Sequence, residues 1–138
     1  MNGLTLAYLG DSYYELEIRK YLVTKGITNV NKLHKSAVMY TSSIAQAHIS
    51  KYLSDQNLLT EEEISLFKRG RNSSGPGRKN VDKTTYQNAT GFEALIGALS
   101  LQDEKRAKEL IAIGINYIER GEDNGQSKWR CNLKWKGT

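Results

Sequence analysis

Apolar residues recur at the three- and four-residue spacing of an α-helix through nearly the whole chain, and this periodicity limits the folds available to it. No segment shows the alternation of β-branched residues, closed by turn residues, that is typical of a β-hairpin. The sequence therefore predicts an all-α protein. The helices are expected at about residues 4–25, 31–40, 44–53, 60–69, 85–101 and 103–120.

Local signals predict where several of these helices begin and end. Gly26 can adopt the left-handed conformation that ends a helix. Thr60 and Glu63 fit a capping box, in which each side chain bonds the other residue's backbone amide. Asp103 can cap the last helix. Residues 70–80 contain three glycines and the only proline, so we expect a loop there.

The length of 138 residues suits one domain with a single core. We expect a globular domain over residues 1–121 and a basic, mobile tail over residues 122–138, which shows no helical periodicity. No apolar run approaches the roughly 18 residues of a membrane span, and no signal peptide precedes the first helix. Cys131 is the only cysteine, which suits a reducing compartment. These features predict a cytoplasmic protein without a membrane partner.

Positive charge is concentrated in one segment of the chain. Residues 66–83 hold six cations and one acid, a net charge of +5, and the whole chain also has a net charge of +5. A polyanion is the expected partner of such a segment. The alternative is a solvated loop whose charges only aid solubility. The six cations are Lys68, Arg69, Arg71, Arg78, Lys79 and Lys83.

Three carboxylates occur on helix faces that are otherwise apolar. At about 100° per residue, Asp11 and Glu15 fall one turn apart on one stripe of the first helix. Glu93 is the only charge in GFEALIGALSL. A buried carboxylate must pair with a cation, bind a metal or be held protonated. For any single acid, Arg19 or a cation from another helix is the simplest partner. The apolar members of the first stripe are Leu4, Tyr8, Ile18 and Leu22.

A metal ion is the alternative that explains all three acids together. Asp11 and Glu15 can address one point in space because they are four residues apart. Carboxylate oxygens without cysteine suit Mg²⁺, whereas His34 and His48 show no zinc-ligand spacing. A bound Mg²⁺ can stabilise charge on phosphoryl oxygens and lower the pKa of an attacking water. Beside a basic segment, it indicates a nucleic acid backbone as the substrate.

Three motifs resemble the ribonuclease III family, and most closely its short form without a double-stranded-RNA-binding domain. They are LTLAYLGDSYYE at residues 4–15, KRGRN at 68–72 and TGFEALIGAL at 90–99. LGD alone is a weak signal, but LGD followed well downstream by FEALIG is specific. The resemblance implies an all-helical ribonuclease III fold, a homodimer and Mg²⁺-dependent hydrolysis of double-stranded RNA to 5′-phosphate and 3′-hydroxyl ends. In the cell it implies maturation of large-subunit ribosomal RNA precursors.

The resemblance assigns the catalytic, metal-binding acids to Asp11 and Glu93. Ala7 and Thr90 stand where the usual signature has two further acids. Glu15 is a supporting metal-site residue from spacing alone, since it could replace part of the missing charge. The expected RNA-binding residues are Arg69, Arg71, Arg78, Lys79 and Lys83.

Two other classes of protein compete with the nuclease. A non-catalytic RNA-binding or ribosome-associated module could use the same fold, but retention of both Asp11 and Glu93 favours the enzyme. A helical DNA-binding protein would place its cations on a recognition helix. In this sequence the cations gather around a glycine-rich stretch instead.

Overall fold

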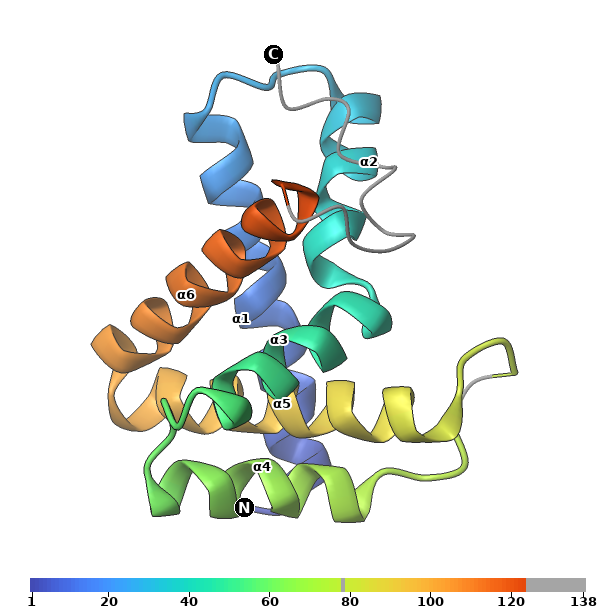
Figure 1. Ribbon diagram of the computed structural model, residues 1–138, viewed down its shortest axis with the longest axis vertical. Helices are drawn as coiled ribbons and strands as arrows, with labels where there is room; N and C mark the ends of the chain where they lie inside the picture. Colours follow the sequence, from blue (N-terminus) through green and yellow to red (C-terminus); the bar gives the residue numbers. More distant parts are fainter. Residues whose placement is uncertain (78, 124–138) are drawn as a thin grey trace.

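A computed structural model describes residues 1–77 and 79–123, and within those residues the chain forms six α-helices (Figure 1). The predicted all-α fold is confirmed. The last helix extends two residues beyond the predicted domain boundary at residue 121, and the rest of the predicted tail lies outside the described residues. The helices are α1 (Gly3–Thr24), α2 (Val30–Thr41), α3 (Ser43–Asp55), α4 (Glu61–Ser73), α5 (Lys83–Gln102) and α6 (Glu104–Asp123).

The helix ends follow the predicted local signals. Gly26 has a φ of 96° directly after the end of α1. The Thr60 hydroxyl accepts from the Glu63 amide at 3.1 Å, and the Glu63 carboxylate accepts from the Thr60 amide at 2.9 Å. Asp103 accepts from an amide in the first turn of α6. The capping box and both other signals are therefore confirmed.

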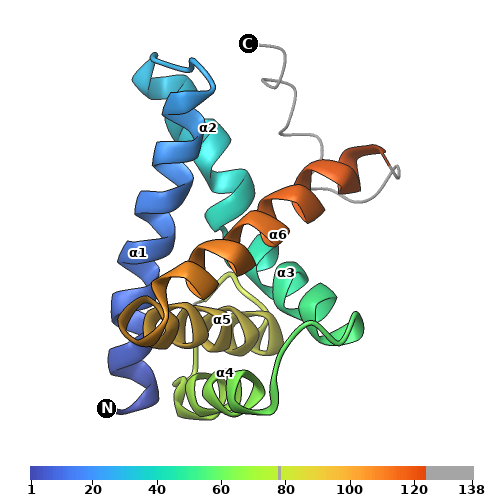
Figure 2. The same cartoon turned by 90° about the vertical axis from the view of Figure 1, so that its left-hand side faces the viewer.

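Helix α5 is the central element of the fold. It makes its most extensive contacts with α1, α4 and α3. Figure 2 shows α1 and α2 side by side and α4 packed against α5 at the N-terminal end of α1. Tyr14 of α1 is fully buried, and its ring meets Phe92 of α5 edge to face, with 5.2 Å between ring centroids. This contact joins the two longest apolar faces of the core.

The predicted loop begins later than the sequence indicated. Helix α4 continues to Ser73, so the connection to α5 covers residues 74–82. Gly70 is buried, and a Cβ on it would lie 2.4 Å from the Cβ of Ala94. Because this close contact with α5 requires a glycine, Gly70 serves packing and does not break the helix. The prediction that it opens the loop was wrong.

None of the helices in the described part of the chain is long and apolar enough to cross a lipid bilayer.

Candidate active site

Helices α1 and α5 cross with their backbones in direct contact. A Cβ on Gly10 would lie 1.7 Å from the carbonyl oxygen of Glu93, and a Cβ on Gly97 would lie 2.0 Å from that of Leu6. Only glycine at both positions allows such an approach. Asp11 directly follows Gly10, so Asp11 and Glu93 belong to the same helix crossing.

The buried Tyr14 lies one turn after Gly10 on α1 and anchors this part of the helix. Its hydroxyl donates to the carbonyl oxygen of Tyr40 at 2.7 Å. Burial raises the pKa of Tyr14, and the charges of Glu15 and Glu93 raise it further. Tyr14 therefore stays protonated as a donor, and both carboxylates lie near enough to act on it.

The predicted apolar stripe of α1 is correct only in its C-terminal half. Ile18 and Leu22 are fully buried, whereas Leu4 is 50% exposed and Tyr8 is 81% exposed. The prediction gave no weight to glycine, and glycines form much of the buried face in the first half of the helix. The buried residues there are Gly3, Leu6, Ala7 and Gly10.

The three acids are consequently less buried than their positions on apolar helix faces suggested. Asp11 is exposed, while Glu15 and Glu93 are half-buried. Glu15 accepts a hydrogen bond from Arg19 at 3.0 Å, so the ion-pair alternative holds for this acid. The described residues contain no group of three or more histidine, cysteine, aspartate or glutamate side chains placed to hold a metal. Asp11 and Glu93 remain the metal-site residues that the family resemblance implies, and the supporting role of Glu15 stays a prediction from spacing.

These two acids fit a hard divalent cation. Mg²⁺ is commonly held by one or two carboxylates, with waters and substrate phosphates completing its ligands. Asp11 is exposed and Glu93 is half-buried, so both carboxylates are accessible to a cation. Thr90 adds nothing to the set, because its hydroxyl donates to the carbonyl oxygen of Tyr86 at 2.9 Å.

Gln46 is a site residue that the sequence did not reveal. It lies on α3, is 3% exposed, and donates from Nε2 to Oε2 of Glu93 at 3.3 Å. A neutral amide carries no charge signal and belongs to none of the quoted motifs. Only the packing of α3 against α5 brings it to the carboxylate.

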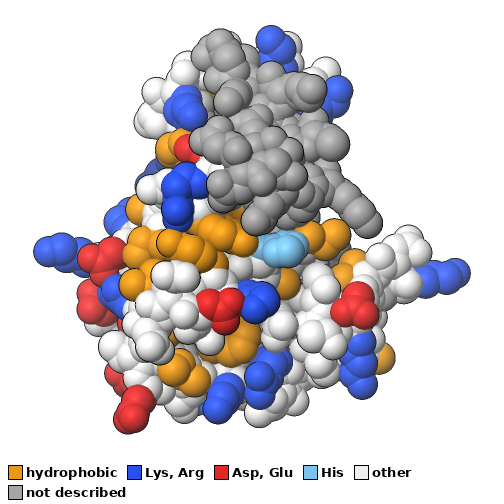
Figure 3. All heavy atoms as spheres, in the orientation of Figure 1, with side chains coloured by type: hydrophobic (Ala, Val, Ile, Leu, Met, Phe, Trp, Pro, Cys, Tyr) orange, Lys and Arg blue, Asp and Glu red, His pale blue; other side chains and the backbone are white. Residues whose placement is uncertain are grey.

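The cations of the basic segment are divided between two helices and a loop. Arg69 and Arg71 lie near the C-terminal end of α4, Lys79 lies in the loop, and Lys83 is the first residue of α5. Arg78 lies outside the described residues. The loop projects from the α4–α5 pair in Figure 1, and Figure 3 shows Lys and Arg side chains along α4 and toward the loop. The described cations of the segment are therefore carried by the end of α4, the connection and the start of α5.

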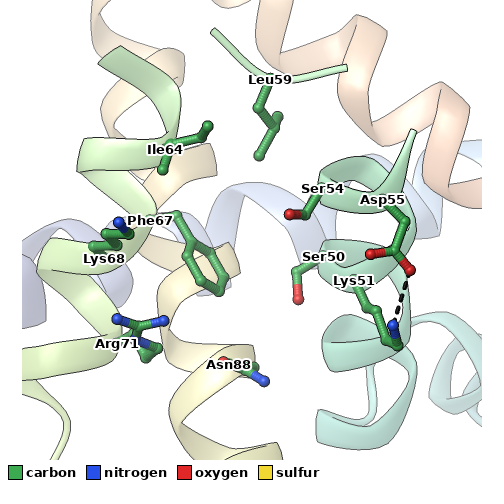
Figure 4. A pocket seen from close by; sticks show the side chains of 10 residues that line it. All are labelled: Ser50, Lys51, Ser54, Asp55, Leu59, Ile64, Phe67, Lys68, Arg71 and Asn88. Atoms are coloured by element: carbon green, nitrogen blue, oxygen red, sulfur yellow. Dashed lines mark hydrogen bonds and ion pairs between the residues drawn. The ribbon is translucent and has the colours of Figure 1, made fainter. Parts of the chain in front are cut away.

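Arg71 is less exposed than Arg69, Lys79 and Lys83. It is half-buried and borders a cleft of about 240 Å³ between α3, α4 and α5 (Figure 4). Its guanidinium lies 5.9 Å from the ring centroid of Phe67, which projects into the cleft. Across the cleft, Lys51 pairs with Asp55 at 2.8 Å. Arg71 therefore combines a contact with Phe67 and a position at the edge of the cleft.

The six-helix fold is the one that the family resemblance implied, and comparisons with known proteins identify the class as a helical nuclease. A model of the ribonuclease III domain matches residues 4–104, which include Asp11 and Glu93. The chain belongs to the ribonuclease III family.

Within that family its relatives are Mini-ribonuclease 3 proteins. The one from Acholeplasma laidlawii is 59% identical over 125 residues, covering 91% of this chain and all of the relative. The one from Enterococcus faecalis is 50% identical, covering 90% of this chain and 94% of the relative. The chain is accordingly an endoribonuclease of the Mini-ribonuclease 3 type. This outcome favours the enzyme over the non-catalytic module.

The fold is also that of a solved structure. The crystal structure of protein FN1578 from Fusobacterium nucleatum matches with a TM-score of 0.74 and 37% sequence identity. The match covers 84% of this chain and 93% of that one.

Proposed function

We propose that this endoribonuclease hydrolyses double-stranded RNA in a Mg²⁺-dependent reaction, with Asp11 and Glu93 as its catalytic, metal-binding residues. The observation that carries the proposal is the backbone contact between Gly10 and Glu93, because it sets Asp11 at the same crossing as Glu93. Bound Mg²⁺ would stabilise charge on the phosphoryl oxygens and lower the pKa of the attacking water. Glu15 is a supporting residue of this site, and its ion pair with Arg19 offsets part of its negative charge.

The two acids have different surroundings and so different tasks. Asp11 is exposed and meets the RNA backbone from the surface of α1. Glu93 is half-buried and already accepts a hydrogen bond from Gln46, which favours one orientation of its carboxylate. Fixed ligands lower the reorganisation needed when substrate binds.

We propose that the basic segment binds the RNA. A-form RNA presents phosphates and 2′-hydroxyls across a shallow minor groove, so a protein can hold it largely by shape. Residues 74–82 lie between cations at the end of α4 and the start of α5, which suits contacts to phosphates on a curved surface. The contributing residues are Arg69, Arg71, Arg78, Lys79 and Lys83.

We further propose a homodimer, in which two centres cut the two strands of a duplex. Leu4 and Tyr8 are exposed apolar residues on the same stripe as Asp11, and clustered exposed apolar residues indicate an interface. Two glycines of α5 pack against other helices of the same subunit and so are not available for a dimer contact. Gly97 contacts α1 and Gly91 contacts Phe67 of α4.

For the cellular substrate we propose large-subunit ribosomal RNA precursors. This part of the proposal rests on the likeness to the short members of the family.

Cleavage assays with defined nucleic acids test the activity. The wild-type protein should cut a long RNA duplex in Mg²⁺ and leave it intact in EDTA, and it should spare a DNA duplex of the same sequence. Asp11→Asn and Glu93→Gln should each reduce cleavage by more than the roughly 10- to 100-fold that loss of an outer metal-site partner causes. Glu62→Gln, which neutralises an exposed acid on α4, should cleave like the wild type. Near wild-type turnover by Asp11→Asn would exclude it as a ligand.

A further inference from the structure

Gln46 connects the corner between α2 and α3 to the candidate active site. Its Nε2 donates to the backbone carbonyl oxygen of Thr41 at 3.0 Å and to Oε2 of Glu93 at 3.3 Å. Thr41 is the last residue of α2, and Gln46 lies in the first turns of α3. One buried amide group therefore fixes the position of Glu93 relative to two other helices.

The orientation of this amide follows from its partners. If the nitrogen and oxygen of Gln46 were exchanged, the oxygen would face a carbonyl and a carboxylate, and all three groups are acceptors. The donor end of Gln46 therefore points to Glu93. Gln46 consequently acts on the carboxylate and is not itself placed as a metal ligand.

The other end of the amide has no partner. Oε1 of Gln46 is buried and accepts no hydrogen bond. A buried acceptor without a donor is destabilising, and an apolar side chain of similar shape would remove that penalty. The unpaired oxygen therefore offsets part of the stability gained from the hydrogen bond to Thr41. The contact with Glu93 is the one that links this glutamine to the candidate site.

We infer that Gln46 is a positioning residue for the metal site, which orients the Glu93 carboxylate before Mg²⁺ and RNA bind. The inference rests on the proposed function, because it assumes that Glu93 is a metal ligand. Groups that hydrogen-bond a ligating carboxylate fix its direction and so raise the affinity for the metal.

Metal binding by the RNA-free protein tests this role separately from folding. Mn²⁺, which can be followed by electron paramagnetic resonance, replaces Mg²⁺ in the titration. Gln46→Met should bind Mn²⁺ about 10-fold or more weakly than the wild type. Its melting temperature in EDTA should change little, because removal of the unpaired acceptor offsets loss of the hydrogen bond to Thr41. Its affinity for an RNA duplex in EDTA should be unchanged.

Ser36→Ala is the matched control. Its hydroxyl is the other described buried polar group without a partner, and Ser36 lies on α2 outside the site. This variant should bind Mn²⁺ like the wild type.

A second variant keeps the inference testable if Gln46→Met folds poorly. Gln46→Glu puts a second carboxylate against Glu93, so its melting temperature in EDTA should fall. Mn²⁺ should then raise that temperature by more than it does in the wild type, because the cation relieves the repulsion between the two acids.

Two results would overturn the role of Gln46 alone. One is wild-type Mn²⁺ affinity in Gln46→Met while Glu93→Gln loses binding. The other is an equal Mn²⁺-induced rise in melting temperature in Gln46→Glu and the wild type. Failure of the wild type to bind Mn²⁺ or to cleave RNA would instead overturn the proposed function, and this inference with it.

Discussion

Gly10 of α1 and Gly97 of α5 pack backbone against backbone, so that a Cβ on Gly97 would lie 2.9 Å from the nitrogen of Gly10. Most helix pairs are separated by side chains at roughly 8–10 Å between axes. Here the missing side chains let the helices touch, and that contact sets the place of Asp11 relative to Glu93.

Gly10→Ala should therefore destabilise the protein. The added Cβ would overlap the carbonyl oxygen of Glu93, a backbone atom that cannot move independently of α5. We expect a loss of at least about 2 kcal/mol in the free energy of unfolding, although alanine is the better helix former. Urea denaturation measures the loss. Gly75→Ala is the control, since its Cβ would meet nothing within 4 Å, and an equal loss there would contradict the contact as described.

A buried ion pair between α4 and α6 gives a second prediction. Arg106 donates to both carboxylate oxygens of Glu63, at 2.8 and 3.0 Å, and Glu63 is 5% exposed. Arg106→Met leaves this carboxylate buried without its partner. Because Arg106 is itself partly exposed, we expect a loss near the lower end of the roughly 3–5 kcal/mol typical of broken buried pairs. Lys51→Met, which breaks the exposed pair with Asp55, should change stability little.

The same pair should make stability depend on pH. The hydrogen bond from Arg106 is the main cause that lowers the pKa of Glu63 below its ordinary 4.5. A lowered folded-state pKa contributes stability above pH 4.5 that is lost as the pH falls through the lowered value. Urea titrations below pH 4.5 should show a steeper loss in the wild type than in Arg106→Met. If stability fell equally with pH in the wild type and in Arg106→Met, the Glu63–Arg106 pair would not be the cause of the pH dependence.

Sequence periodicity and capping residues were enough to predict the six helices, because each depends on residues within one or two turns. The errors involve partners distant in the chain. Gly70 signals a loop locally, yet it is buried where α4 meets α5. Leu4 and Tyr8 form an apolar stripe in the sequence, yet the face of α1 that contains Gly3 and Gly10 is the one that packs against other helices.

The candidate site could likewise be predicted only in part from the sequence. Asp11 and Glu93 follow from the family motifs and stay predictions, whereas the contact of Gln46 with Glu93 and the Glu63–Arg106 pair required the three-dimensional structure. Gln46 lies 47 residues from Glu93 in the sequence, and Arg106 lies 43 residues from Glu63. Periodicity carries no information about which helix faces which.

The basic segment should dominate the salt dependence of RNA binding. Each phosphate contact removed lowers the slope of log affinity against log salt by about 0.9 for a B-form duplex, and by a similar order for RNA. Replacing Arg71, Arg78 and Lys79 with alanine should thus weaken binding and reduce the slope by about two to three. Fluorescence anisotropy across a KCl series measures this slope.

The basic tail is the alternative RNA-binding segment. A chain that ends at Asp123 should still bind RNA almost as tightly as the full chain. If this shortened chain lost affinity while the triple variant kept the wild-type slope, the tail and not the basic segment would bind the RNA.

Tyr8 tests the proposed dimer. Its side chain is 81% exposed, so Tyr8→Asp should leave the subunit fold intact while it charges the apolar contact. Sedimentation at micromolar concentration should show a dimer for the wild type and a monomer for Tyr8→Asp. Val23→Asp, at an exposed apolar residue nearer the C-terminal end of α1, should remain dimeric. A wild type that is monomeric while active would exclude an obligate dimer.

The most direct test of Asp11 and Glu93 as a shared metal site is anomalous diffraction from a crystal of the protein soaked in Mn²⁺. One peak should lie between the two carboxylates, close to the roughly 2.1 Å that separates ligand oxygens from Mg²⁺. The peak should be lost in Asp11→Asn. Carboxyl groups more than about 10 Å apart within one subunit could not share an ion or its waters at such distances. That separation, or a peak bound elsewhere, would contradict the site.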